Sequence, residues 1–463
     1  KLITDNLYAF GFLLLIPALI GLGVGEHALA GIFAVGAGVF ILGGWALRRH
    51  LVVSEVHYRH AAMAIALTWL SLSLISCIPF VLHGIDGIDA LFESFSAWTD
   101  TGLTMIPHPE DLPVSLSVFR VLMQWVSGLG IVMFMLSLRG PSPRAAHSLF
   151  QAEGRFEDFS TDLWTMGRTV VAIYSGYTVL GFVLLWLLGV PPFHALTHAI
   201  TSLSTGGFST NNVGVGLYGV LPSLVAMGLM LCGGISFGSH QALLSGDVKK
   251  FFRNPEIRAL FAIVAGATGL LLLEQWLIRG QVRDRILDSL FYVVTAISTC
   301  GAGTTLSLTE VPDTFVFTVL FLMLSGAVYG STTGALKLWR LLILGKVVQR
   351  EIRRPFYPQG TVMPLRMGRN LITEETALQV AAYVLLYLVL GLAGSLSFML
   401  FGYDALHAMF TVFSAQGNVG LNAMPDVLYY GMPAFLKVQL IFHMLIGRME
   451  ILPFFYVLRS LRE

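Results

Sequence analysis

Long apolar stretches constrain the fold of this chain more than any other feature of its sequence. Ten of them have about the 20 apolar residues that a helix needs to cross a bilayer. They cover approximately residues 7–24, 28–47, 60–82, 116–138, 169–190, 217–244, 257–278, 313–345, 376–401 and 432–458. Only 12% of the 463 residues are charged, about half the charged share of soluble domains, which is about 25%. We therefore predict an all-α, multi-pass membrane protein.

The remaining composition excludes several classes of function. The formal net charge of +1 gives no basic surface field for nucleic acid. Cys77, Cys232 and Cys300 lie too far apart to suggest a disulfide framework or a zinc site. The sequence contains no HExxH motif and no GxSxG nucleophile elbow between a strand and a helix, since its one GxSxG match (234–238) lies within an apolar stretch, so we do not expect an enzyme.

The distribution of Lys and Arg predicts the orientation of the spans. Basic residues gather in 139–168, 246–258 and 337–369, whereas 83–115, 189–222 and 402–435 contain none. By the positive-inside bias the first three segments are cytoplasmic and the last three are external. The basic loop around 279–285 is an exception, because the alternation of spans places it outside.

Four shorter apolar segments recur on the external side. They read "DALFESFSAWTDTGLT" from 89, "HALTHAITSLSTGGFST" from 194, "DSLFYVVTAISTCGAGT" from 288 and "DALHAMFTVFSAQGNVGLN" from 404. Each is too short to cross a bilayer and ends in a turn rich in Gly, Ser and Thr. Such a recurrence predicts a fourfold repeat of span, short helix, turn and span.

One glycine in each turn marks the register of the repeat. The step from the first residue of the segment to Gly102, Gly207 and Gly301 is 13 residues each time. In the fourth segment the same step reaches Gly417, whereas the shared letters "FSA" align Gly102 with Gly420. The spacing alone leaves both glycines open.

Irregular backbone at membrane depth is tolerated where it is buried in protein or lines a water-filled cavity. Four converging turns of this kind can present carbonyl oxygens that replace the hydration shell of a cation. Glycine suits such turns because it adopts backbone conformations that other residues resist. The alternative is that these glycines only allow close helix packing.

Two further features lie within predicted spans. The stretch "SGAVYGSTTGALK" (325–337) places Gly326, Gly330 and Gly334 inside 313–345, where we expect an interrupted helix or, alternatively, a packing face. Arg448 and Glu450 lie within the last span. A charge at that depth is costly and usually functional, although Arg448 could instead snorkel to the interface with Glu450 as its partner.

These repeats and their turns resemble the TrkH-type potassium transporters of the Trk/Ktr/HKT superfamily, over essentially the whole chain. The resemblance implies a selectivity filter for K+ and an intramembrane gate that contains Arg448. It favours Gly420 over Gly417. Asp100 departs from the commoner pattern, and because its side chain is a carboxylate beside the first turn, we expect it to be a solvated residue at the external mouth that concentrates cations. The alternatives are that it has a role in the filter site or no role. The implied filter residues are Thr101, Gly102, Gly206, Gly207, Cys300, Gly301, Val419 and Gly420. The implied gate residues are Gly326, Gly330, Ser331, Thr332, Thr333, Gly334 and Arg448.

The resemblance also implies an organisation and a set of partners. The expected units are a two-span hairpin (1–50) and four repeats (51–145, 146–250, 251–370 and 371–463) around one central pore. K+ is the expected transported ion, with no organic cofactor, in a bacterial cytoplasmic (inner) membrane. We expect a homodimer, surrounded by membrane lipid, that binds a soluble nucleotide-binding regulator of the TrkA type. The alternative function is a Na+- or H+-coupled transporter with relaxed K+/Na+ selectivity.

Overall fold

The computed structural model describes residues 2–48, 58–130, 163–279, 285–358, 360–368 and 370–449. The described part is predominantly helical, which confirms the predicted all-α fold class. Three of the sequence-based expectations fall outside these residues: the unit boundaries at 50/51 and 145/146, and Glu450.

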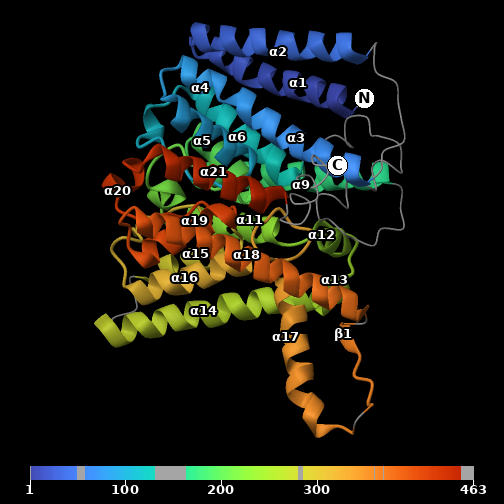
Figure 1. The fold of residues 1–463 in the computed structure, drawn as a ribbon. Coiled ribbons are helices and arrows are strands. Elements are labelled where there is room, and N and C mark those ends of the chain that lie inside the picture. The colour runs from blue at the N-terminus through green and yellow to red at the C-terminus, as the bar shows by residue number, and fades with distance from the viewer. Residues whose placement is uncertain are drawn as a thin grey trace.

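The first two helices form an antiparallel hairpin at one edge of the bundle (Figure 1). They are α1 (Leu2–Gly23) and α2 (His27–Arg48). Phe10 packs edge-to-face on Phe40, with the ring centroids 4.8 Å apart. The carboxylate of Glu26, between the two helices, accepts a hydrogen bond of 2.7 Å from the backbone N–H of Val114. The hairpin is thereby fixed to the first repeat.

Four sets of helices follow, each with a short helix between longer ones. The first set has α3 (Tyr58–Ser76), α4 (Ile78–Leu82), α5 (Gly87–Trp98) and α6 (Val114–Leu129). The second has α9 (Leu163–Leu187), α10 (Pro192–Ser204), α11 (Val220–Gly234), α12 (Phe237–Leu244) and α13 (Val248–Arg253). The third has α14 (Pro255–Arg279), α15 (Ile286–Ile297), α16 (Asp313–Ser325) and α17 (Leu338–Arg353). The fourth has α18 (Glu374–Leu400), α19 (Ala405–Gln416), α20 (Asp426–Tyr430) and α21 (Ala434–Met449).

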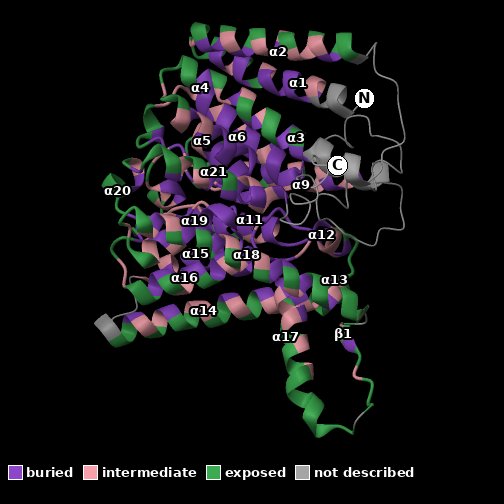
Figure 2. Cartoon of the chain, in the orientation of Figure 1, coloured by how far each residue is buried: buried purple, intermediate pink, exposed green. Residues whose placement is uncertain are grey.

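The outer helices have the exposure that a lipid-facing surface requires. Exposed positions cover the outward faces of α2 and α14, whereas α5, α6 and α19 are mostly buried inside the bundle (Figure 2). Four helices in the described ranges are long and apolar enough to cross a membrane. These are the stretches His27–Leu47, Gly167–Leu187, Pro255–Leu277 and Glu374–Leu400. The chain is therefore a multi-pass membrane protein.

The predicted span 217–244 is not a continuous helix. The stretch 217–244 is divided into α11 and α12, which are bent by 108° relative to each other. The break follows Gly233 and Gly234, and Ile235 has extended backbone angles. The carbonyl oxygen of Gly233 accepts a hydrogen bond from the N–H of Thr332, at 3.1 Å. The helix therefore ends where a loop of the third repeat contacts it.

A short arm extends from the third repeat. Helix α17 leaves the bundle beyond α14, and the hairpin of β1 (Leu365–Met367) and β2 (Asn370–Ile372) lies beside it (Figure 1). The two strands are antiparallel, with Leu365 opposite Ile372. Ile343, Leu365 and Val380 belong to one buried apolar cluster that fixes the arm to α18.

Candidate functional site

The four short helices α5, α10, α15 and α19 end in turns with the same backbone conformation. The residue that begins each turn is not glycine but has a positive φ, which costs energy for residues with a Cβ. These φ values are 57° at Asp100, 63° at Thr205, 52° at Thr299 and 51° at Asn418. Two residues later a glycine also has a positive φ: 86° at Gly102, 71° at Gly207, 71° at Gly301 and 96° at Gly420. Four different sequences therefore form one turn geometry.

The backbone distinguishes the two candidate glycines of the fourth repeat. Gly417 caps α19 with a φ of −80°, a value that any residue can adopt. Gly420 follows the positive-φ residue Asn418 by two positions, as Gly102 follows Asp100. Gly420 therefore occupies the position that matches the other three glycines.

The four glycines form a closed cycle of contacts between repeats. A Cβ added to each of them would lie closer than 3.0 Å to a carbonyl oxygen of the next repeat, a distance that real Cβ atoms essentially never show. The pairs are Gly102 with the carbonyl of Gly206, Gly207 with Cys300, Gly301 with Val419, and Gly420 with Thr101. The eight predicted filter residues thus lie together in one ring, and each glycine is required by the backbone that it contacts.

Burial differs systematically within the ring. The residues before the glycines (Thr101, Gly206, Cys300 and Val419) are buried, whereas the four glycines are partly exposed. The glycines therefore line an accessible path, and the preceding residues are held by the surrounding protein. The short helices end next to this path, so the partial negative charge of their C-termini favours a cation there.

Side chains that the sequence did not single out brace these turns. The amide of Gln124, on α6, donates to the carbonyl of Gly206 at 2.5 Å and accepts from the N–H of Phe208 at 3.2 Å. The hydroxyl of Ser414 accepts from the N–H of Gly420 at 3.1 Å and donates to the carbonyl of Leu421 at 2.7 Å. A polar residue within an apolar stretch, such as Gln124 in "MQWVSG", is the sequence feature that could have identified these bracing side chains.

A buried ion pair supports the segments that follow the first two turns. Nε of Arg120 on α6 donates to Glu93 on α5 at 2.6 Å, and the side chains are 2% and 0% exposed. Glu93 also accepts from the hydroxyl of Thr104 at 2.9 Å and from the N–H of Met105 at 3.3 Å. The guanidinium of Arg120 lies 4.1 Å above the ring of Phe208, the residue after Gly207. This pair was also missed, because the two residues are 27 positions apart and lie on different helices.

The third repeat contains a non-helical segment beneath the ring. Helix α16 ends at Ser325 and α17 begins at Leu338, so residues 326–337 form a loop between the two helices. Gly326 and Gly330 have φ values of 61° and 77°, which interrupt the helix. Within the loop, the hydroxyls of Ser331 and Thr333 lie 2.8 Å apart.

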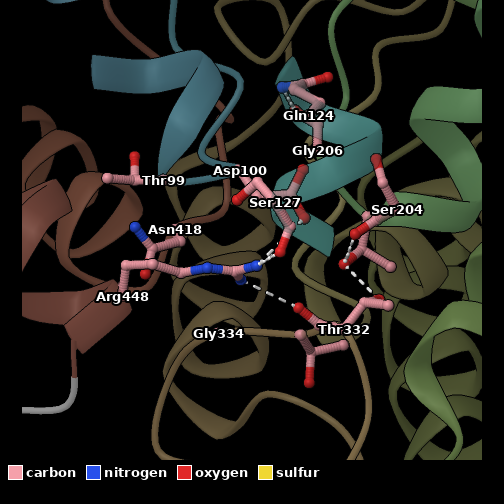
Figure 3. Close-up of polar contacts among 12 residues, drawn as sticks. Thr99, Asp100, Gln124, Ser127, Ser204, Gly206, Thr332, Gly334, Asn418 and Arg448 are labelled. Atoms are coloured by element: carbon pink, nitrogen blue, oxygen red, sulfur yellow. Dashed lines mark hydrogen bonds and ion pairs between the residues drawn. The ribbon is translucent and has the colours of Figure 1, made fainter. Parts of the chain in front are cut away.

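The loop contacts the turns of the second and third repeats directly. The hydroxyls of Thr332 and Thr205 are 2.9 Å apart, and the N–H of Gly334 donates to the hydroxyl of Thr299 at 3.0 Å. Thr205 and Thr299 are the residues that begin their turns. The predicted gate segment therefore lies against the inner end of the ring (Figure 3).

Arg448 extends from α21 into the same region (Figure 3). Its guanidinium donates to the carbonyl of Thr332 in the loop, at 3.2 Å, and to the carbonyl of Ser127 at the end of α6. Its side chain is 9% exposed. Arg448 therefore points into the protein beneath the ring rather than towards an interface.

Asp100 has a different position from the one expected. It is 2% exposed, and one carboxylate oxygen lies 3.9 Å from Nη2 of Arg448. Like Thr205 and Thr299, Asp100 begins its turn, at the end of the ring that the loop 326–337 and Arg448 contact. Asp100 is thus a buried residue at the inner end of the first turn, not a solvated residue at an external mouth.

Comparison with known proteins places this geometry in context. The family model for TrkH, described as a cation transport protein, matches residues 31–462. An uncharacterized cation transporter of Methanocaldococcus jannaschii is 31% identical, over 96% of this chain and 91% of the relative. The Trk system potassium uptake protein TrkH of Salmonella typhimurium is 28% identical, over 96% and 94%. The crystal structure of the potassium transporter TrkH from Vibrio parahaemolyticus has a TM-score of 0.85 and 26% identity, and covers 98% of this chain and 97% of that one.

Proposed function

The chain belongs to the TrkH family of cation transport proteins, and from this membership we propose that it takes up K+ through the ring of four turns. The observation that carries the proposal is the closed cycle in which Gly102, Gly207, Gly301 and Gly420 each contact a carbonyl of the next repeat. A ring of backbone carbonyls is the chemistry that replaces the water around K+. The printed names of the relatives support K+ as the ion, since several are potassium uptake proteins.

In this proposal, the carbonyls of Thr101, Gly206, Cys300 and Val419, together with those of the four glycines, form the selectivity filter. Its walls need to be rigid enough to keep the carbonyls in place when an ion leaves. The hydrogen bonds from Gln124 and Ser414 to the turns supply part of this rigidity.

The loop 326–337 and Arg448 form the gate. The loop lies directly inward of the turns, with Thr332 and Gly334 bonded to the residues that begin two of them. Its residues Gly326, Gly330, Ser331, Thr332, Thr333 and Gly334 would have to move aside before a hydrated ion could pass. The guanidinium of Arg448 adds a positive charge at this level, which raises the electrostatic barrier to K+.

The organisation and partners remain part of the same proposal. The four repeats would divide near 145, 250 and 370, after a hairpin that ends near 50. We further propose a homodimer in a bacterial cytoplasmic membrane, controlled by a soluble nucleotide-binding regulator of the TrkA type. The exposed arm of α17 and the β hairpin offers a surface outside the bundle for such contacts.

Growth and flux measurements test this function. Expression of the chain should restore growth at low K+ to a bacterium that lacks K+ uptake. In liposomes, the purified protein should carry Rb+ and K+ down their own gradients without an applied Na+ or H+ gradient. A strict requirement for such a gradient would favour the alternative of a coupled transporter, and the absence of any K+-dependent growth or flux would refute the proposal.

We expect replacement of Arg448 by alanine to increase K+ flux by roughly tenfold, since each 1.4 kcal/mol removed from a barrier gives a factor of ten. The change removes a fixed positive charge beneath the filter and two hydrogen bonds that restrain the loop and α6. Rb+ uptake into liposomes, normalised to the amount of reconstituted protein, measures the effect. Replacement by lysine, which keeps the charge, should give a much smaller increase; equal increases for both variants would show that charge is not the barrier.

A further inference from the structure

Asp100 is the one charged residue among the four that begin the filter turns. Thr205, Thr299 and Asn418 occupy the matching positions, with φ values within 51–63°, close to the 57° of Asp100. The turn itself therefore does not require an aspartate. A carboxylate at this depth needs another reason, because burying a charge is costly unless it is compensated.

The compensating charge comes from the gate. The carboxylate of Asp100 lies 3.9 Å from the guanidinium of Arg448, and their side chains are 1% and 9% exposed. At this distance two opposite charges attract far more strongly in the protein interior than in water. The two residues belong to the first and last repeats, which are neighbours in the ring, so the attraction acts between adjacent repeats.

Arg448 thereby joins three parts of the molecule. Its guanidinium contacts the carbonyl of Thr332 in the loop, the carbonyl of Ser127 at the end of α6, and the carboxylate of Asp100 (Figure 3). The first two groups are neutral carbonyls, whereas the carboxylate of Asp100 can carry a full negative charge. A second oxygen of the same carboxylate lies against Gly206, where an added Cβ would meet it. The carboxylate is therefore held between the second turn and Arg448.

We propose that Asp100 is a positioning residue of the gate: its carboxylate holds the guanidinium of Arg448 against the loop and so favours the closed state. The inference rests on the proposed function, in which Arg448 and the loop 326–337 form the gate. It deepens that function by naming the residue in the filter that sets the position of Arg448.

The competing interpretation is that Asp100 acts on the ion itself. A negative charge at the inner end of the filter attracts K+, and its removal would then lower flux whether or not Arg448 is present. If Asp100 instead positions Arg448, its removal releases the gate and increases flux, and it does so only when Arg448 is present. The two interpretations therefore differ in the sign of the effect.

A double-mutant cycle in the full-length protein tests the proposal. Asp100→Asn and Asp100→Thr place at this position the residue types that the other repeats carry there, so both variants should form the turn. We expect each to increase Rb+ flux into liposomes about threefold, as a weakened contact shifts the gate towards its open state. In the Arg448→Ala background the same changes should alter flux less than about 1.5-fold, because their effects are not independent. Asp100→Glu, which keeps the carboxylate, should return flux towards the wild-type value.

Matched measurements separate the possible outcomes. Asp86→Asn removes a carboxylate from the exposed N-terminus of the same short helix, where asparagine also caps, and should leave flux unchanged. A decrease in flux on replacing Asp100, or an equal change with and without Arg448, would overturn the proposal while leaving the K+ pathway intact. A destabilised protein would lose flux rather than gain it, which also counts against the proposal. If wild-type protein carries no K+ or Rb+, it is the proposed function that fails.

Discussion

Replacement of Gly207 by serine should reduce K+ flux by roughly tenfold or more and lower the ratio of K+ to Na+ permeability. Gly207 has a φ of 71°, which side chains with a Cβ adopt only at a cost of about 1–2 kcal/mol. A Cβ at this position would also lie closer than 3.0 Å to the carbonyl oxygen of Cys300. Serine therefore displaces one of the carbonyls that are proposed to coordinate the ion, and a misplaced carbonyl discriminates less well between cations of different size.

Rb+ and Na+ uptake into liposomes measures both quantities in one preparation. Gly228→Ala is the matched control, because Gly228 lies on α11 of the same repeat and a Cβ there meets nothing within 4 Å. The control should keep wild-type flux and wild-type selectivity. An unchanged ratio of K+ to Na+ permeability in Gly207→Ser would remove Gly207 from the filter.

The position of the ring could be predicted because the constraint is local and recurs. Each turn needs a glycine at one place, where the φ is positive and a neighbouring carbonyl leaves no room for a Cβ. That requirement appears in the sequence as four glycines at matching positions after short apolar segments. The spacing in the fourth repeat was ambiguous because "QGNVG" contains two glycines; the resemblance favoured Gly420, and the backbone angles separate it from the helix cap Gly417.

Contacts between repeats could not be predicted in the same way. Asp100 and Arg448 are 348 positions apart, so nothing in the local pattern of either stretch indicates that they meet. The expectation that Asp100 is solvated followed from its polarity alone, whereas the turn carries it to the inner end of the ring. The break between α11 and α12 was missed for a related reason. Hydropathy does not reveal a break in the helix when the residues around it are apolar. The residue whose N–H binds the free carbonyl of Gly233 at the break is Thr332, which belongs to another repeat.

The buried pair of Glu93 and Arg120 allows a prediction about stability. Glu93→Gln should lower the free energy of unfolding by about 3–5 kcal/mol, because it leaves the guanidinium of Arg120 buried without its compensating charge. The exposed fractions of the two side chains are 0% and 2%, so water cannot solvate the charge that remains. Arg120→Met should be similarly destabilising, since it leaves the Glu93 carboxylate uncompensated. Thermal and denaturant unfolding of the detergent-solubilised protein measure the loss.

The double variant shows whether the loss of stability in the single variants comes from an uncompensated charge or from lost packing. Glu93→Gln with Arg120→Met removes both charges, so the protein should regain much of the stability that either single change costs. The exposed pair of Arg350 and Glu374 supplies the control: Glu374 is 75% exposed, and Glu374→Gln should cost less than about 1 kcal/mol. Additive losses in the double variant would show that the two side chains act through separate contacts.

The same double variant also tests whether the pair supports the filter. Glu93 binds Thr104 and Met105, and Arg120 covers Phe208, so both side chains hold the segments that follow the first two turns. The folded double variant should therefore discriminate less well between K+ and Na+. Restored stability with unchanged selectivity would limit this pair to supporting the fold.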